Sequence, residues 1–152
     1  MPREHRPTRS VRILLAESGA AARGALAIRL GMVPGFAVVA RAATGDEAVA
    51  AATAVRPDVA LVDFELPGAG GPATAAALLA EVPECRVLVL ATFGGPQRLR
   101  QVLAAGAAGF LVEDGPVDDL VRAVRAALTG ETVIDPAFTG RTGRTSDAPT
   151  PP

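Results

Sequence analysis

Five short apolar runs, separated by stretches of helical pattern, limit most strongly what this chain can fold into. The runs are residues 11–16, 36–40, 59–62, 86–91 and 109–112. Each run is continuous rather than alternating, which is typical of strands buried on both faces of a parallel sheet. The helical stretches between and after the runs are residues 20–30, 46–56, 72–81, 96–105 and 117–129. This alternation predicts an α/β domain with a flavodoxin-like, doubly wound sheet of five parallel strands, a (βα)5 arrangement with right-handed crossovers.

The size and charge of the chain favour one globular domain. Its 152 residues are 49% hydrophobic, which is enough for a substantial core. The net charge of −1 gives no overall basic surface for DNA or for an anionic membrane, so a DNA contact would need a local patch or another domain. We assign the domain to residues 11–138. We expect a disordered basic tail at residues 1–10 and a linker at residues 139–152.

The sequence also bears on where the protein works. The first ten residues, MPREHRPTRS, lack the apolar core of a signal peptide, and the single Cys85 cannot form an internal disulfide. The most apolar long stretch, residues 11–43, is interrupted by five charged side chains, which is too many for a membrane span. We therefore expect a cytoplasmic protein without a membrane segment.

Polar side chains follow four of the predicted strands at their carboxyl ends, where ligands and reactions lie in such sheets. They are Glu17 and Ser18 after the first strand, Asp63 after the third, Thr92 after the fourth and Glu113 after the fifth. A carboxylate in the place of Asp63 can accept a phosphoryl group if a divalent ion and a cation neutralise the added charge. It can equally cap a helix or stabilise the Pro-Gly turn that follows.

Several stretches, in their order and spacing, resemble the receiver domains of two-component response regulators. They are VRILLA at residue 11, RPDVALVD at 56, LPG at 66, RVLVLATF at 86 and AGAAGFLV at 105. Within these CheY-like domains the chain is most similar to the NarL/FixJ family and its DesR-like branch. The resemblance implies that Asp63 is the phosphoacceptor, Thr92 the switch hydroxyl and Phe110 the switch aromatic. It also implies a helix-turn-helix DNA-binding domain beyond the linker and outside this chain.

The chain departs from the family at two positions that serve phosphorylation. The family's adjacent acidic pair, which holds Mg²⁺, is here Glu17 and Ser18, and a neutral hydroxyl is a poor replacement for a carboxylate. Glu65 could substitute, although the family uses mainly the backbone carbonyl there. We expect Mg²⁺ binding at Glu17 and Asp63 to be weak or absent, and no cofactor to be required.

The second departure is Glu113, which stands where the family has Lys. All 15 basic residues of the chain are Arg, so no Lys is available elsewhere. A unit charge pair at about 4 Å and a dielectric near 20 is worth roughly 4 kcal/mol, attractive with Lys and repulsive with Glu. If Glu113 joins Glu17 and Asp63, crowding should raise the pKa of at least one carboxyl group. The alternative is that Glu113 points into solvent.

Three functional interpretations remain open. The first is an atypical, non-enzymatic receiver that signals without phosphorylation, by a homodimer through the helices at 20–30 and 117–129 or by contact with a ligand or protein. The second is a conventional phosphorelay, in which a histidine kinase phosphorylates Asp63. The third is a small flavodoxin-like enzyme that uses its carboxylates. The third is disfavoured because the single His5 lies in the tail and no nucleophile–base pair is visible.

Overall fold

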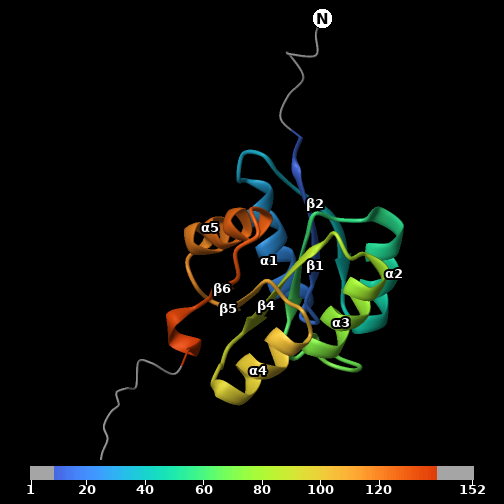
Figure 1. Ribbon diagram of the computed structural model, residues 1–152. Helices are drawn as coiled ribbons and strands as arrows, with labels where there is room; N and C mark the ends of the chain where they lie inside the picture. The colour runs from blue at the N-terminus through green and yellow to red at the C-terminus, as the bar shows by residue number, and fades with distance from the viewer. Residues whose placement is uncertain (1–8, 140–152) are drawn as a thin grey trace, which may run out of the picture.

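A computed structural model describes residues 9–139 and shows one sheet covered by helices on both faces (Figure 1). The strands are β1 (Val11–Ala16), β2 (Phe36–Ala42), β3 (Val59–Asp63), β4 (Arg86–Ala91), β5 (Gly109–Val112) and β6 (Val133–Ile134). The helices are α1 (Ala20–Gly31), α2 (Gly45–Val55), α3 (Gly71–Glu81), α4 (Pro96–Ala104), α5 (Val117–Leu128) and the short 3-10 helix η2 (Pro136–Phe138). All paired strands are parallel, in the order β2-β1-β3-β4-β5-β6. The predicted flavodoxin-like, doubly wound fold is confirmed.

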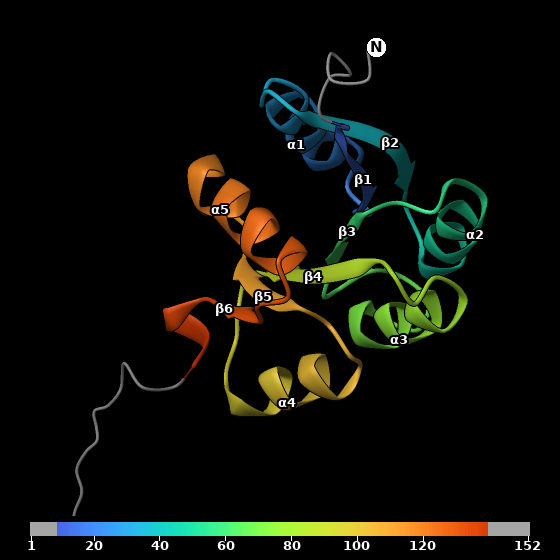
Figure 2. The ribbon, with the colours of Figure 1, turned by 45° about the horizontal axis from the view of Figure 1, so that its top comes forward.

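The helices divide between the two faces of the sheet. Helices α1 and α5 cover one face, and α2, α3 and α4 cover the other (Figures 1 and 2). Alternate residues of a strand point to opposite faces, so β1 sends Ile13 and Leu15 towards α1 and α5, and Leu14 and Ala16 towards the other layer. All four side chains are at most 1% exposed. This burial on both faces explains why the apolar runs are continuous.

The sheet has one strand more than the five that the sequence predicts. Val133 and Ile134 pair with Gly109 and Phe110 as the short strand β6 at the edge of the sheet. Two residues are too few to produce a recognisable strand pattern. A Cβ on Gly109 would lie 2.9 Å from the carbonyl oxygen of Val133 and 2.6 Å from Leu88, so the glycine is what allows this strand to approach.

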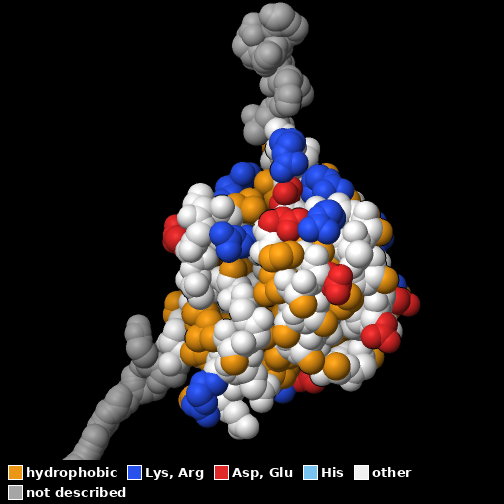
Figure 3. All heavy atoms as spheres, turned by 45° about the vertical axis from the view of Figure 1, so that its right-hand side comes forward, with side chains coloured by type: hydrophobic (Ala, Val, Ile, Leu, Met, Phe, Trp, Pro, Cys, Tyr) orange, Lys and Arg blue, Asp and Glu red, His pale blue; other side chains and the backbone are white. Residues whose placement is uncertain are grey.

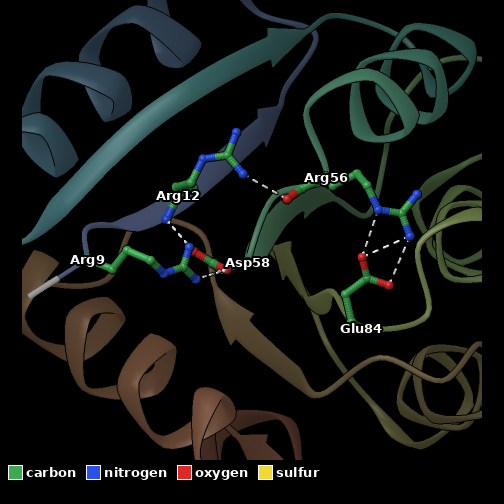
Figure 4. Close-up of polar contacts among 5 residues, drawn as sticks. All are labelled: Arg9, Arg12, Arg56, Asp58 and Glu84. Atoms are coloured by element: carbon green, nitrogen blue, oxygen red, sulfur yellow. Dashed lines mark hydrogen bonds and ion pairs between the residues drawn. The ribbon is translucent and has the colours of Figure 1, made fainter.

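At the amino ends of the strands, Asp58 connects the start of β1 to β3. Its carboxylate accepts hydrogen bonds from the backbone amide of Arg12 at 2.9 Å and from the Arg9 guanidinium at 3.1 Å (Figure 4). Next to it, Arg56 donates two hydrogen bonds to Glu84, at 2.9 and 3.1 Å. Basic and acidic side chains gather at this end of the surface (Figure 3).

The two predicted flanks fall mainly on residues that the structure does not describe. Residues 1–8 of the predicted tail and residues 140–152 of the predicted linker lie outside the described range. Arg9, which belongs to the predicted tail, is described and is paired with Asp58. Among residues 9–139, no helix combines the length and the apolar character that crossing a membrane requires.

Candidate functional site

The carboxyl ends of β1, β3, β4 and β5 meet at one edge of the sheet because the strands are parallel and in register. Ala16 pairs with Val62, Asp63 with Leu90, and Ala91 with Val112. The pairing continues into the following loops, where the amide of Glu113 donates to the carbonyl of Ala91 at 2.9 Å. This register brings the carboxyl ends of three strands to one place: Asp63 ends β3, and Glu17 and Glu113 directly follow β1 and β5.

Three carboxyl groups converge at this edge. Glu17, Asp63 and Glu113 each offer an oxygen, and the three oxygens lie within 4.8 Å of one another. Asp63 is 7% exposed, and Glu17 and Glu113 are half-buried. Of the two orientations considered for Glu113, the structure therefore shows the one that faces Asp63.

Burial and the proximity of other acidic groups raise the pKa values of Asp63 and Glu113 in this carboxyl cluster. Desolvation raises the pKa of Asp63, and the charges of Glu17 and Glu65 add to the rise, while a hydrogen bond from the Glu65 amide opposes it. Desolvation also raises the pKa of Glu113 to about 8, with further contributions from a hydrogen bond with Glu17 and from the charge of Asp63. At neutral pH Glu113 thus retains a proton that it can donate within the cluster.

The loop after β1 holds Glu17 through its own backbone. The Glu17 carboxylate accepts a hydrogen bond from the amide of Gly19 at 3.0 Å, and its carbonyl accepts one from Arg23 at 2.7 Å. Ser18 is exposed, and its carbonyl lies 3.4 Å from the same guanidinium. The carboxyl oxygens that meet here and could face a divalent ion are those of Glu17, Asp63 and Glu113.

Glu65 lies apart from the carboxyl cluster. Its amide donates to the Asp63 carboxylate at 3.1 Å, whereas its own carboxylate accepts from Arg98 of α4 at 2.7 Å. The Arg98 guanidinium also covers the ring of Phe64, 4.2 Å from its centroid. The sequence gives no signal for Arg98, because its position depends on how α4 packs against the loop after β3.

The two expected switch residues differ in their surroundings. Thr92 is exposed immediately after β4. Phe110 is fully buried, and its ring lies between Phe64, at a centroid distance of 6.1 Å, and Phe138, at 4.5 Å. Phe138 directly precedes the predicted linker, and no pattern in the sequence indicates that it joins this stack.

Comparisons with known proteins identify the family to which this fold belongs. The family model for the response regulator receiver domain matches residues 13–125. The transcriptional regulatory protein DesR from Bacillus subtilis is 31% identical over 126 residues, which cover 83% of this chain and 62% of DesR. This chain spans about three fifths of the length of the curated relatives that it matches.

Two solved structures share the fold along most of their length. A LuxR-family two-component response regulator from Aurantimonas superposes with a TM-score of 0.80 at 28% identity, covering 85% of this chain and 92% of that one. The receiver domain of NarL from Mycobacterium tuberculosis has a TM-score of 0.77 at 31% identity, covering 82% of this chain and 100% of that one. This chain is thus a member of the response regulator receiver domain family, a family of signalling domains, and it is close to the NarL/LuxR-type regulators.

Proposed function

We propose that this receiver domain controls a transcriptional output without phosphorylation of Asp63. The observation that carries the proposal is the position of Glu113, which meets Asp63 and Glu17 where the resemblance implies a lysine. A phosphoryl group on Asp63 would add negative charge to a site that has an acidic group in place of a cation. The proton held by Glu113 removes one negative charge from the cluster in the absence of phosphate.

The same residues argue against a requirement for Mg²⁺. A family-type site needs hard, charged oxygens, and the family's second acidic residue is here the exposed Ser18. Glu65 is not a replacement in this arrangement, because its carboxylate is bound to Arg98. Three carboxyl oxygens do meet, but one belongs to Glu113, whose pKa is raised to about 8, so an ion would have to displace a proton to bind there. We propose that any Mg²⁺ at Glu17 and Asp63 binds weakly.

The names of the relatives support the proposed transcriptional output. DesR is a transcriptional regulatory protein, and this chain spans only 62% of its length. We propose that this receiver acts in the cytoplasm, with a helix-turn-helix domain outside this chain contacting DNA. Sites bound by such factors have two-fold symmetry, which a receiver that dimerises constitutively would match.

Helices α1 and α5 are the proposed dimer surface. They lie on the same face of the sheet (Figure 2), and two large apolar side chains are exposed there, Ile28 of α1 at 65% and Met32, directly after α1, at 76%. Between the end of α1 and the start of α5 is a groove of about 440 Å³. It is lined by Arg29, Met32, Val33, Pro34, Val117, Asp118 and Val121. Exposed apolar residues rimmed by charges of both signs are typical of protein interfaces.

We expect a homodimer at concentrations of tens of micromolar without any phosphoryl donor, and the same dimer in Asp63→Asn. Ile28→Glu combined with Met32→Glu should give a monomer, because burying two unpaired charges in the interface is costly. Light scattering across a concentration series measures this. The matched control is Leu103→Glu, on exposed α4 at the opposite face, which should remain dimeric. A monomeric unmodified chain, or a dimer that survives the double substitution, contradicts the proposed surface.

A further inference from the structure

The segment that follows α5 is fastened to the receiver by backbone pairing. The amide of Val133 donates to the carbonyl of Ala108 at 2.8 Å, and the amide of Asp135 donates to that of Phe110 at 2.9 Å. The Asp135 carboxylate then accepts from the amide of Ala137 at 2.9 Å, which starts helix η2. Residues 132–138 therefore form an ordered strap along the edge of the sheet.

The strap ends in an aromatic side chain that is enclosed by the receiver. Phe138 is 3% exposed, and its ring lies 4.5 Å from that of Phe110. Gly94, in the loop between β4 and α4, also lies next to this ring. A Cβ on Gly94 would lie 2.1 Å from Cδ1 of Phe138. Gly94 and Phe110 thus form a pocket that holds the Phe138 ring, here called the Phe138 pocket. Any side chain at position 94 would occupy the space that the ring fills.

The residues that surround Phe138 are connected to the carboxyl ends of β3 and β4. Gly94 follows Thr92 by two residues, and Thr92 follows β4 directly. Phe110 packs against Phe64, the residue after Asp63. A ring leaving this pocket would remove contacts from the β4–α4 loop and from β5 at once. A packed core element with two discrete positions is the kind of element that can link distant sites.

We propose that Phe138 is a latch, which in the pocket formed by Gly94 and Phe110 holds residues 132–138 on β5 and fixes the β4–α4 loop beside the carboxyl cluster. Release of the ring frees the strap and the loop together. The position of Thr139, from which the chain continues, is then coupled to the conformation of the β4–α4 loop, which carries Thr92. This coupling does not depend on whether Asp63 is phosphorylated.

The composition of the chain offers a direct test. It has five phenylalanines, Phe36, Phe64, Phe93, Phe110 and Phe138, and no Tyr or Trp. Labelling with 4-fluorophenylalanine gives one fluorine signal for each, assigned by single Phe→Leu variants. Phe93 is 66% exposed in the β4–α4 loop and reports its state, and Phe36 of β2 reports the fold away from the latch.

Phe138→Ala should shift the signals of Phe110 and Phe93 and leave that of Phe36 in place. The exchange of the Val133 and Asp135 amide protons should accelerate at least about tenfold, because the strap opens locally. Phe138→Leu, which still fills most of the pocket, should lie between Phe138→Ala and the unmodified chain. Loss of the Phe36 signal position would indicate a folding defect, in which case the Leu variant carries the test.

Gly94→Ala is the second test of the latch. The φ of Gly94 is not positive, so alanine at this position is not disfavoured by the backbone itself. Gly94→Ala should release the strap as Phe138→Ala does, but have little further effect in the Phe138→Ala background, where the clashing ring is gone. Gly24→Ala, on α1 with open space around its Cβ, is the matched control and should change neither signal. Equal effects of Gly94→Ala in both backgrounds, or an unchanged Phe93 signal in Phe138→Ala, would overturn the latch.

Discussion

Ser18→Asp combined with Glu113→Lys is expected to make Asp63 accept a phosphoryl group in the presence of Mg²⁺. The first change returns a carboxylate to the metal-binding pair, and the second replaces the acidic group of the cluster with an ammonium. Glu113 is protonated at neutral pH and offers no cation, whereas an ammonium about 4 Å from the Asp63 carboxylate, at a dielectric near 20, is worth roughly 4 kcal/mol of attraction. Partial exposure of Glu113 reduces this value, yet the effect should still take the adduct from undetectable to nearly stoichiometric.

Each single substitution should do less than the pair, because the ion and the ammonium stabilise the same transition state. Intact mass after incubation with a small acyl phosphate measures the adduct. Adding Asp63→Asn to the double variant is the control, and it should abolish the mass shift. Glu113→Gln with Ser18→Asp returns the carboxylate without adding a cation, and therefore isolates the contribution of the ammonium. If the double variant stays inert with a native circular dichroism spectrum, the defect lies in geometry rather than charge.

The free energy of unfolding should fall as the pH rises from about 4.5 to about 8. The pKa of Glu113 is raised from 4.5 to about 8 in the folded protein, first of all by burial. Below this range both states hold the proton, and within it the unfolded chain loses the proton while the folded chain keeps it. Stability must then decrease with pH, by on the order of 2 kcal/mol after allowance for solvent screening. The raised pKa of Asp63 acts in the same direction.

Urea unfolding at a series of pH values, compared with Glu113→Gln, checks this dependence. The amide cannot ionise, so the variant should have a flatter profile and should be more stable than the unmodified chain at pH 8. Glu131→Gln, at an exposed residue after α5 and outside the cluster, is the control and should keep the original slope. A Glu113→Gln profile parallel to that of the unmodified chain would mean that Glu113 titrates as a free side chain.

The fold could be predicted because its pattern is local. The continuous apolar runs predict the bounds of β1 to β5 closely. The largest difference is at β2, which ends at Ala42 rather than at residue 40. The missing strand, β6, depends on a contact distant in sequence: Val133 reaches β5 only because Gly109 has no side chain.

The carboxyl cluster could also be anticipated, since parallel strands bring their carboxyl ends to one edge. What the sequence left open was side-chain direction. Glu113 turns towards Asp63, and Glu65 turns to Arg98, because the packing of α4 and of the β5–α5 loop determines which partner each carboxylate reaches. The packing of Phe138 against Phe110 is likewise a tertiary contact, and no periodic pattern in the sequence predicts it.

The central claim is that Asp63 of the unmodified chain is not a phosphoacceptor, and intact mass spectrometry tests it most directly. The chain is incubated with excess Mg²⁺ and a small acyl phosphate at neutral pH, beside a conventional receiver domain as a positive control. The account predicts an unchanged mass while the control gains one phosphoryl group. A stoichiometric phosphoryl adduct that disappears in Asp63→Asn would contradict it and would restore the phosphorelay reading.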